Sequence, residues 1–162
     1  WTYVTDVLPA VVASMLRVST ERADTYVAGL SMGGYGAMRW ALLQPERFAA
    51  AASLSGALAL SDAHGRQDPW FRALLDRSFG PGGIDGTDAD LSHLIRTSDP
   101  DRLPALYAAC GTEDFLLGAT EAFAATCGES GVATTVRYGP GGHEWAYWDR
   151  QIQDVLDWLP LT

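Results

Sequence analysis

The sequence contains no lysine, and its 11 basic residues, all arginine, are outnumbered by 20 acidic ones. The net charge of −9 offers no basic surface for phosphate groups, so we expect no nucleic-acid partner. Cysteine is also scarce: Cys110 lies in an expected buried strand and Cys127 in an expected helix, without a CxxC pair. This pattern predicts reduced thiols in a reducing, cytoplasmic compartment rather than a disulfide framework.

The chain also lacks internal repeats, low-complexity tracts, a visible signal peptide and any apolar run long enough to span a membrane. At 162 residues it can form one domain with a real core. His64 and His93 show no metal-ligand spacing and are expected on the surface. A calcium loop near Asp90 is disfavoured, because Arg96 stands where an EF-hand has its last glutamate. We expect no metal and no cofactor.

The most informative pattern is G-x-S-x-G around Ser31, with Gly29 and Gly33 on either side. An apolar strand is expected before it, at 26–30, and a helix after it, at 34–43. Between a strand and a helix this motif is typical of a nucleophile elbow. We expect both glycines to avoid a collision in the tight turn, and the helix N-terminus to stabilise an oxyanion near the serine.

Two further candidates follow strands later in the chain. Asp114 comes directly after a predicted strand at 106–110, and His143 follows one at 134–138. The carboxyl ends of parallel strands meet at one edge of a sheet, where catalytic groups gather. The order serine, acid, histidine is the one that a nucleophile elbow requires. The plainer alternatives are a glycine-rich turn that happens to contain serine, a helix-capping Asp114 and a loop histidine.

Four stretches together resemble the esterase D group of α/β hydrolases, which includes S-formylglutathione hydrolases and tributyrin-type esterases. They span almost the whole chain: Gly29-Leu-Ser-Met-Gly-Gly-Tyr-Gly-Ala37, Pro45-Glu-Arg-Phe48 with Ser53-Leu-Ser-Gly56, Cys110-Gly-Thr-Glu-Asp-Phe-Leu117, and Gly142-His-Glu-Trp-Ala-Tyr-Trp148. The resemblance implies Ser31 as nucleophile, Asp114 as acid and His143 as base. Glu113 is the rival acid, because it adjoins Asp114 and some relatives use glutamate.

The resemblance also implies an α/β-hydrolase fold, with a mainly parallel sheet flanked by helices. Residues 1–162 correspond to the C-terminal part of one such domain. Apolar spacing predicts a helix at 5–18 with an apolar stripe on one side, a helix at 115–128, and a helix at 144–159 that buries Trp145 and Leu156 among others. It also predicts a strand at 48–54, and Asp90 is expected to cap a short helix that runs to Arg96. Residues 57–103 are an insertion that is expected to shape the acyl pocket.

The N-terminal strands of that fold have no counterpart in the sequence. Met32 N–H can donate to an oxyanion, but the second donor cannot be placed. We expect the elbow strand to need a neighbour, from a second copy or a complementing N-terminal chain, unless the chain is a fragment. The predicted function is a serine carboxylesterase that hydrolyses short acyl esters or thioesters. The alternatives are an acyltransferase with the same residues and a non-catalytic fragment or interaction module.

Overall fold

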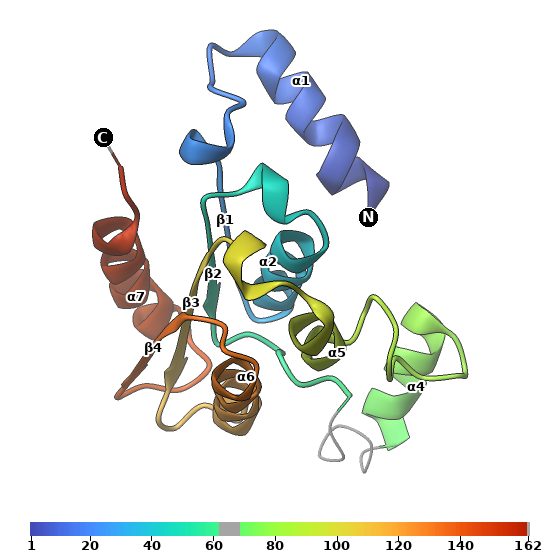
Figure 1. The fold of residues 1–162 in the computed structure, drawn as a ribbon. Coiled ribbons are helices and arrows are strands. Elements are labelled where there is room, and N and C mark those ends of the chain that lie inside the picture. The colour runs from blue at the N-terminus through green and yellow to red at the C-terminus, as the bar shows by residue number, and fades with distance from the viewer. Residues whose placement is uncertain (62–68, 162) are drawn as a thin grey trace.

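The computed structural model describes residues 1–61 and 69–161, so His64 lies outside the described residues. One sheet of four parallel strands runs through the molecule in the order β1-β2-β3-β4 (Figure 1). The strands are β1 (Tyr26–Leu30), β2 (Ala50–Leu54), β3 (Ala105–Gly111) and β4 (Thr134–Gly139). Each strand therefore pairs with the strand that precedes it in the chain, and the prediction of a parallel α/β sheet is confirmed.

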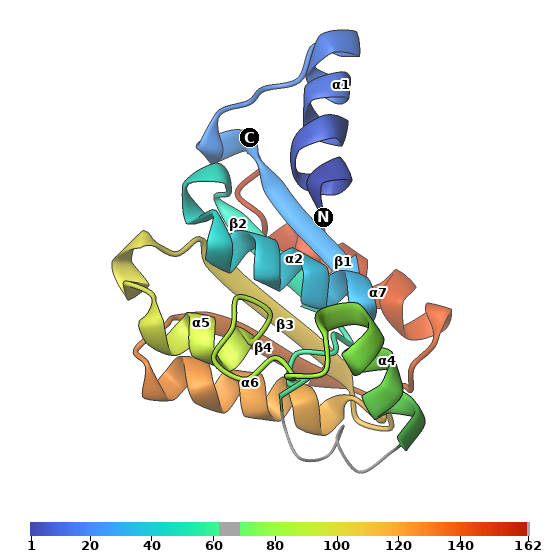
Figure 2. The ribbon, with the colours of Figure 1, turned by 90° about the vertical axis from the view of Figure 1, so that its right-hand side faces the viewer.

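Helices cover both faces of this sheet. On one face lie α2 (Met32–Leu43), α5 (Leu91–Thr97) and α6 (Leu117–Glu129), and on the other lies α7 (Trp145–Trp158) (Figures 1 and 2). The helix α4 (Pro69–Phe79) belongs to the long segment between β2 and β3 and lies further from the sheet. Short 3₁₀ turns connect the elements: η2 (Arg22–Asp24), η3 (Pro45–Arg47) and η4 (Pro100–Arg102).

Alternate residues of the central strands build two apolar cores. Ala51 and Leu106 pack with the helices on the α2 face, whereas Ala52 and Tyr107 pack with α7. This alternation follows from the two-residue period of a strand. Because both faces are covered, every residue of β2 is buried.

The observed strands and the long helices after residue 30 agree with the predicted bounds to within two residues. The predicted cap at Asp90 is also confirmed. Its carboxylate accepts hydrogen bonds from the backbone N–H groups of Ser92 and His93, at 3.0 and 3.2 Å, where α5 begins. Such a cap satisfies N–H groups that have no acceptor within the helix.

The N-terminal segment differs from the helix predicted at 5–18. It starts with a π-helical turn, η1 (Tyr3–Val7), and continues as α1 (Leu8–Met15), after which Leu16 is extended. No residue of α1 is buried, and its predicted apolar stripe is open: the exposed members include Val7, Leu8, Val11, Met15 and Leu16. Trp1 contacts α2, where the guanidinium of Arg39 lies 4.3 Å from its ring.

Two residues that were predicted to be buried on the last helix are exposed. Trp145 lies in the first turn of α7 and is 69% exposed, although its ring packs edge-on against Trp148. Leu156 is 46% exposed, because it follows the buried Val155 by one residue and so points about 100° away around the helix. The buried face of α7 is therefore narrower than the apolar pattern suggests.

Both cysteines are buried and unpaired, in agreement with the prediction of free thiols. Burial raises the pKa of the Cys110 thiol. Within residues 1–61 and 69–161, no helix is long and apolar enough to cross a membrane.

Within the described part of the chain, β1 pairs only with β2. Its other edge presents backbone groups that usually have partners, and the apolar residues of α1 lie open at the same end of the molecule (Figure 2). We therefore expect the purified chain to self-associate along β1 at micromolar concentration. Light scattering should give a mass above that of one chain.

The substitution Ala28→Lys places a charge at an exposed position of β1 and should lower the measured mass toward that of one chain. The matched control is Tyr138→Lys, at an exposed position of β4 on the opposite edge of the sheet, which should leave association unchanged. A wild-type chain that stays monomeric and melts cooperatively would contradict the expectation.

Candidate active site

Ser31 occupies a strained turn between β1 and α2. Its backbone has φ 54° and ψ −120°, a region that residues other than glycine rarely enter. Such a conformation costs on the order of 1–3 kcal/mol and persists only where its surroundings hold it. Here the Ser31 N–H donates to the Leu54 carbonyl at 2.9 Å, and the Ser31 carbonyl accepts from Tyr35 N–H at 3.2 Å. The turn is thus tied to β2 and to the first turn of α2.

The predicted collision holds at only one of the two motif glycines. A Cβ atom at Gly29 would lie 2.3 Å from the carbonyl carbon and oxygen of Gly33, which no side chain tolerates. At Gly33 a Cβ atom would meet no described atom within 4 Å outside its chain neighbours and its own helix, so the expected collision does not occur there. Gly34, next in the chain, is crowded as well, because a Cβ atom there would lie 2.4 Å from Ser53 Oγ.

The structure brings Ser31, His143 and Asp114 into one hydrogen-bonded chain. His143 Nε2 lies 2.9 Å from Ser31 Oγ, and His143 Nδ1 lies 3.0 and 3.2 Å from the two carboxylate oxygens of Asp114. The Asp114 side chain is fully buried, whereas that of His143 is 20% exposed. With the Nδ1 proton directed at Asp114, Nε2 is free to accept the hydroxyl proton of Ser31.

Glu113 has a different set of partners from Asp114. Its carboxylate accepts hydrogen bonds from Gly141 N–H, at 2.5 Å, and from the Thr112 hydroxyl, at 2.9 Å. The Gly141 bond, followed by the Thr112 bond, lowers the pKa of Glu113. Of the two candidate acids, Asp114 is therefore the one that contacts the imidazole, while Glu113 joins the loop after β3 to the loop that carries His143.

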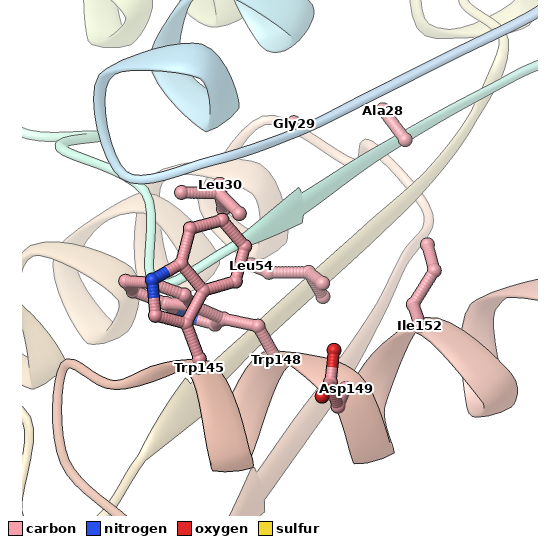
Figure 3. Close-up of a pocket in the computed structure, with 8 residues that line it drawn as sticks. All are labelled: Ala28, Gly29, Leu30, Leu54, Trp145, Trp148, Asp149 and Ile152. Atoms are coloured by element: carbon pink, nitrogen blue, oxygen red, sulfur yellow. The ribbon is translucent and has the colours of Figure 1, made fainter.

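Aromatic rings flank the imidazole on two sides. The Trp148 ring lies perpendicular to the His143 ring at a centroid distance of 4.9 Å, and the Phe115 ring lies at 4.7 Å. Trp148 is buried and Phe115 is exposed. Beside Trp148, an apolar groove of about 220 Å³ runs between α7 and the strands β1 and β2 (Figure 3). The groove includes Gly29 and Leu30, so it reaches the strand end that carries Ser31.

Met32 is the first residue of α2, directly after Ser31. The N–H groups in the first turn of a helix have no acceptor within the helix and form its positive end. The Met32 side chain is 74% exposed, so it covers little of the site. This backbone position is suited to donate a hydrogen bond to negative charge that develops beside Ser31.

Comparison with known proteins places the chain in a family. The model of the Esterase family, described as "Putative esterase", matches residues 1–159. The chain belongs to this family. It is 29% identical over 154 residues to an acetyl esterase of Caldicellulosiruptor saccharolyticus, and the match covers 90% of this chain and 58% of that relative.

Solved structures agree with this assignment to the Esterase family. FphF, a fluorophosphonate-binding serine hydrolase of Staphylococcus aureus, is 29% identical with a TM-score of 0.85, over 99% of this chain and 63% of FphF. An S-formylglutathione hydrolase from Agrobacterium tumefaciens is 27% identical with a TM-score of 0.81, over 97% and 55% of the two chains. The fold is thus that of the α/β hydrolases, and the chain spans about six-tenths of the length of these relatives.

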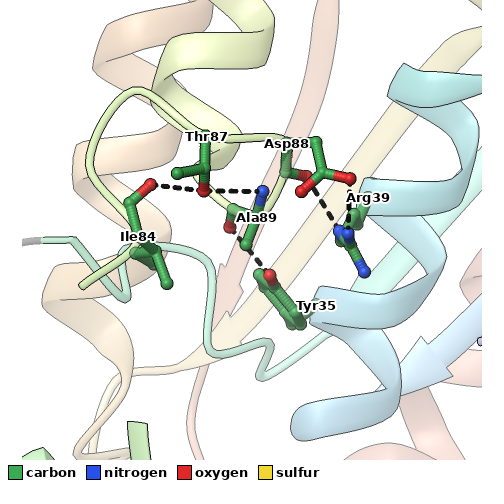
Figure 4. A network of polar contacts seen from close by, with 6 residues as sticks. All are labelled: Tyr35, Arg39, Ile84, Thr87, Asp88 and Ala89. Carbon is green, nitrogen blue, oxygen red and sulfur yellow. Dashed lines mark hydrogen bonds and ion pairs between the residues drawn. The ribbon is translucent and has the colours of Figure 1, made fainter. Parts of the chain in front are cut away.

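In this Esterase-family chain, a polar network joins the segment between β2 and β3 to the helix that begins after Ser31 (Figure 4). The Tyr35 hydroxyl donates to the Ala89 carbonyl at 2.7 Å, and Arg39 donates to the Asp88 carbonyl and carboxylate at 2.8 and 2.9 Å. Burial raises the pKa of Tyr35 to about 12, so the phenol stays protonated as a donor. Nothing in the sequence pattern singled out Tyr35 or Arg39, because their partners lie some 50 residues further along the chain.

The acidic residues near the disfavoured calcium loop are engaged by protein groups. Asp88 pairs with Arg39, and Asp90 accepts N–H groups from Gly86 and from the start of α5. In the stretches that the structure describes, no three histidine, cysteine or acidic residues are grouped so that they could hold a metal ion. His93 contributes its backbone N–H to the Asp90 cap.

The two motif glycines offer a matched pair of variants. Gly29→Ala should lower the free energy of unfolding by about 3 kcal/mol, the upper end of the usual overpacking cost, because its Cβ would overlap the Gly33 carbonyl. Gly33→Ala meets open space and replaces a helical glycine by the best helix former, so it should be neutral or slightly stabilising. Urea unfolding of both variants measures the difference. Equal destabilisation at the two positions would contradict it.

Proposed function

We propose that this chain carries the catalytic residues of a serine carboxylesterase that hydrolyses short acyl esters or thioesters. The observation that carries the proposal is the chain of contacts from Ser31 Oγ through the His143 imidazole to Asp114. Its relatives support the choice of substrate class, since they include an acetyl esterase and an S-formylglutathione hydrolase. In this proposal Ser31 is the nucleophile, His143 the general base and Asp114 the acid that orients the base.

In the acylation half-reaction, Ser31 Oγ attacks the carbonyl carbon while His143 Nε2 takes its proton. The buried Asp114 carboxylate stabilises the imidazolium that forms, and Met32 N–H donates to the oxyanion. When the tetrahedral intermediate collapses, His143 returns the proton to the alcohol or thiol that leaves. The product is an ester between the acyl group and Ser31.

In deacylation, a water molecule replaces the leaving group and His143 again acts as the base. The bond between the acyl carbon and Ser31 Oγ breaks, the carboxylic acid leaves, and the serine recovers its proton. Every proton in this cycle moves between Ser31, His143, water and the leaving group. The cycle therefore calls for no cofactor.

Two parts of the proposed site, the second oxyanion donor and the acyl pocket, involve residues other than Ser31, His143, Asp114 and Met32. A second oxyanion donor is expected, and the loss of one such donor typically lowers the rate by about 10²–10³. We propose that the cover for β1 comes from a second copy of the chain or from a complementing N-terminal chain, which would also supply this donor, and that residues 57–103 shape the acyl pocket. The contact between Phe79 and Tyr35, one helical turn after Ser31, supports a position near the site for this segment.

We also propose a reducing, cytoplasmic setting, which the two buried free thiols support.

Ser31 should react covalently with a fluorophosphonate probe, because an activated serine attacks phosphorus as it attacks a carbonyl. FphF is described as a fluorophosphonate-binding serine hydrolase, which supports the choice of probe. Mass spectrometry of the treated chain should place the adduct on the peptide that contains Ser31, and Ser31→Ala should abolish it. An adduct on another residue of a folded chain would refute the assignment, and no adduct would favour a non-catalytic module.

The two neighbouring acids give a second test. Asp114→Asn should reduce the turnover of p-nitrophenyl butyrate by orders of magnitude, since the equivalent change in serine proteases costs about 10⁴-fold. Glu113→Gln should change turnover little, because an amide oxygen can still accept from Gly141 N–H. Thermal melts of both variants control for folding. The reverse ranking would make Glu113 the acid, and transfer of the butyryl group to an added alcohol in preference to water would indicate an acyltransferase.

A further inference from the structure

Ser55 follows β2 and is, with Ser31, one of two residues other than glycine that have a positive φ in the described part of the chain. Its φ is 48°, and its N–H donates to the Ala109 carbonyl at 2.7 Å, which ties the turn to β3. Strained backbone of this kind is costly and tends to occur at functional sites. Ser55 has no exposed surface, so it cannot contact a substrate directly.

The hydroxyl of Ser55 holds a tryptophan in place. The indole Nε1–H of Trp148 donates to Ser55 Oγ at 3.0 Å, and both residues are buried. An indole N–H has no alternative acceptor in an apolar environment, and leaving it unpaired costs free energy. The hydrogen bond therefore sets the orientation of the Trp148 ring, which cannot turn away without losing its partner.

The oriented ring is one wall of the space that the imidazole occupies. The Trp148 and His143 rings are perpendicular, with centroids 4.9 Å apart. His143 also contacts Phe115, which is 77% exposed and so constrains the imidazole less. Hydrogen bonds to Ser31 and Asp114 fix the two ring nitrogens, but the tilt of the ring about the axis between them depends on packing.

We infer that Ser55 and Trp148 are positioning residues that fix the His143 imidazole between Ser31 and Asp114. Ser55 acts through the indole N–H, and Trp148 acts through contact with the imidazole ring. The inference rests on the proposed role of His143 as the base. It gives a reason for a serine rather than a glycine at a position with positive φ: glycine would relieve the strain but remove the acceptor.

The test compares single variants in the 162-residue chain. Ser55→Ala removes the acceptor and keeps the strain, Ser55→Gly removes both, and Trp148→Phe removes the donor and keeps an aromatic ring. Ser53→Ala is the matched control, since Ser53 is a buried serine on β2 whose hydroxyl lacks a hydrogen-bond partner within the described structure. Thermal melts identify any variant that fails to fold.

Misplacement of a catalytic group by about 1 Å can cost on the order of 10²-fold. We therefore expect Ser55→Ala, Ser55→Gly and Trp148→Phe each to lower kcat for p-nitrophenyl butyrate by about 10- to 100-fold with KM nearly unchanged. The double variant Ser55→Ala/Trp148→Phe should be no slower than Trp148→Phe, since both changes remove the same hydrogen bond between the indole N–H and the Ser55 hydroxyl. Ser53→Ala should match the wild type. Full kcat in Ser55→Gly, or additive losses in the double variant, would overturn the inference.

A second readout does not depend on hydrolysis. The His143 Nδ1 proton, hydrogen-bonded to Asp114, should give a far-downfield proton NMR signal that His143→Gln removes. Ser55→Ala should broaden or shift this signal, whereas Ser53→Ala should leave it in place. If no fluorophosphonate adduct forms on Ser31, the proposed function fails, but an unchanged signal in a folded Ser55→Ala variant would still refute the positioning role.

Discussion

The close approach of the backbone at Gly29 to that at Gly33 is the constraint on which the site depends. It allows the chain to reverse direction within a few residues, from β1 into α2, with Ser31 at the point of reversal. A wider turn would carry the serine away from the strand end and from the edge where β3 and β4 also end. The approach is possible only without a Cβ atom at position 29, so one missing methyl group determines where the hydroxyl lies.

Much of the fold and most of the site geometry follow from local pattern. Apolar runs bounded by glycine and proline mark the strands, and the parallel arrangement brings the residues after β1, β3 and β4 to one edge. The sequence could not distinguish Asp114 from Glu113 on physical grounds, because adjacent residues in a loop can point either way. Their different partners depend on the path of the loop at Gly141, which no local pattern reveals.

The predictions that were wrong depended on which residues from distant parts of the chain lie near a given position, and the sequence pattern does not give this. Gly33 was expected to be crowded, but the space around it depends on which distant residues lie near the start of α2, and no described residue outside its own helix and chain neighbours lies within 4 Å of a Cβ atom at this position. Trp145 lies on the apolar stripe of α7, yet it is exposed, because Tyr147 and Trp148 are the residues of the same helical turn that pack against the sheet. The α1 stripe was correctly read as apolar, but apolarity alone does not identify the surface that would cover it.

Because strand order equals chain order, each strand can join the sheet beside the one before it, as the chain emerges during synthesis. The slowest closure should be that of β2 with β3, since about fifty residues separate them, whereas β3 and β4 are joined by a single helix. Ser31 belongs to the first strand end and His143 to the last. The hydrogen bond between Ser31 and His143 can therefore form only when the whole sheet has assembled, so a chain trapped part-way through folding would hold Ser31 in its turn without the imidazole beside it.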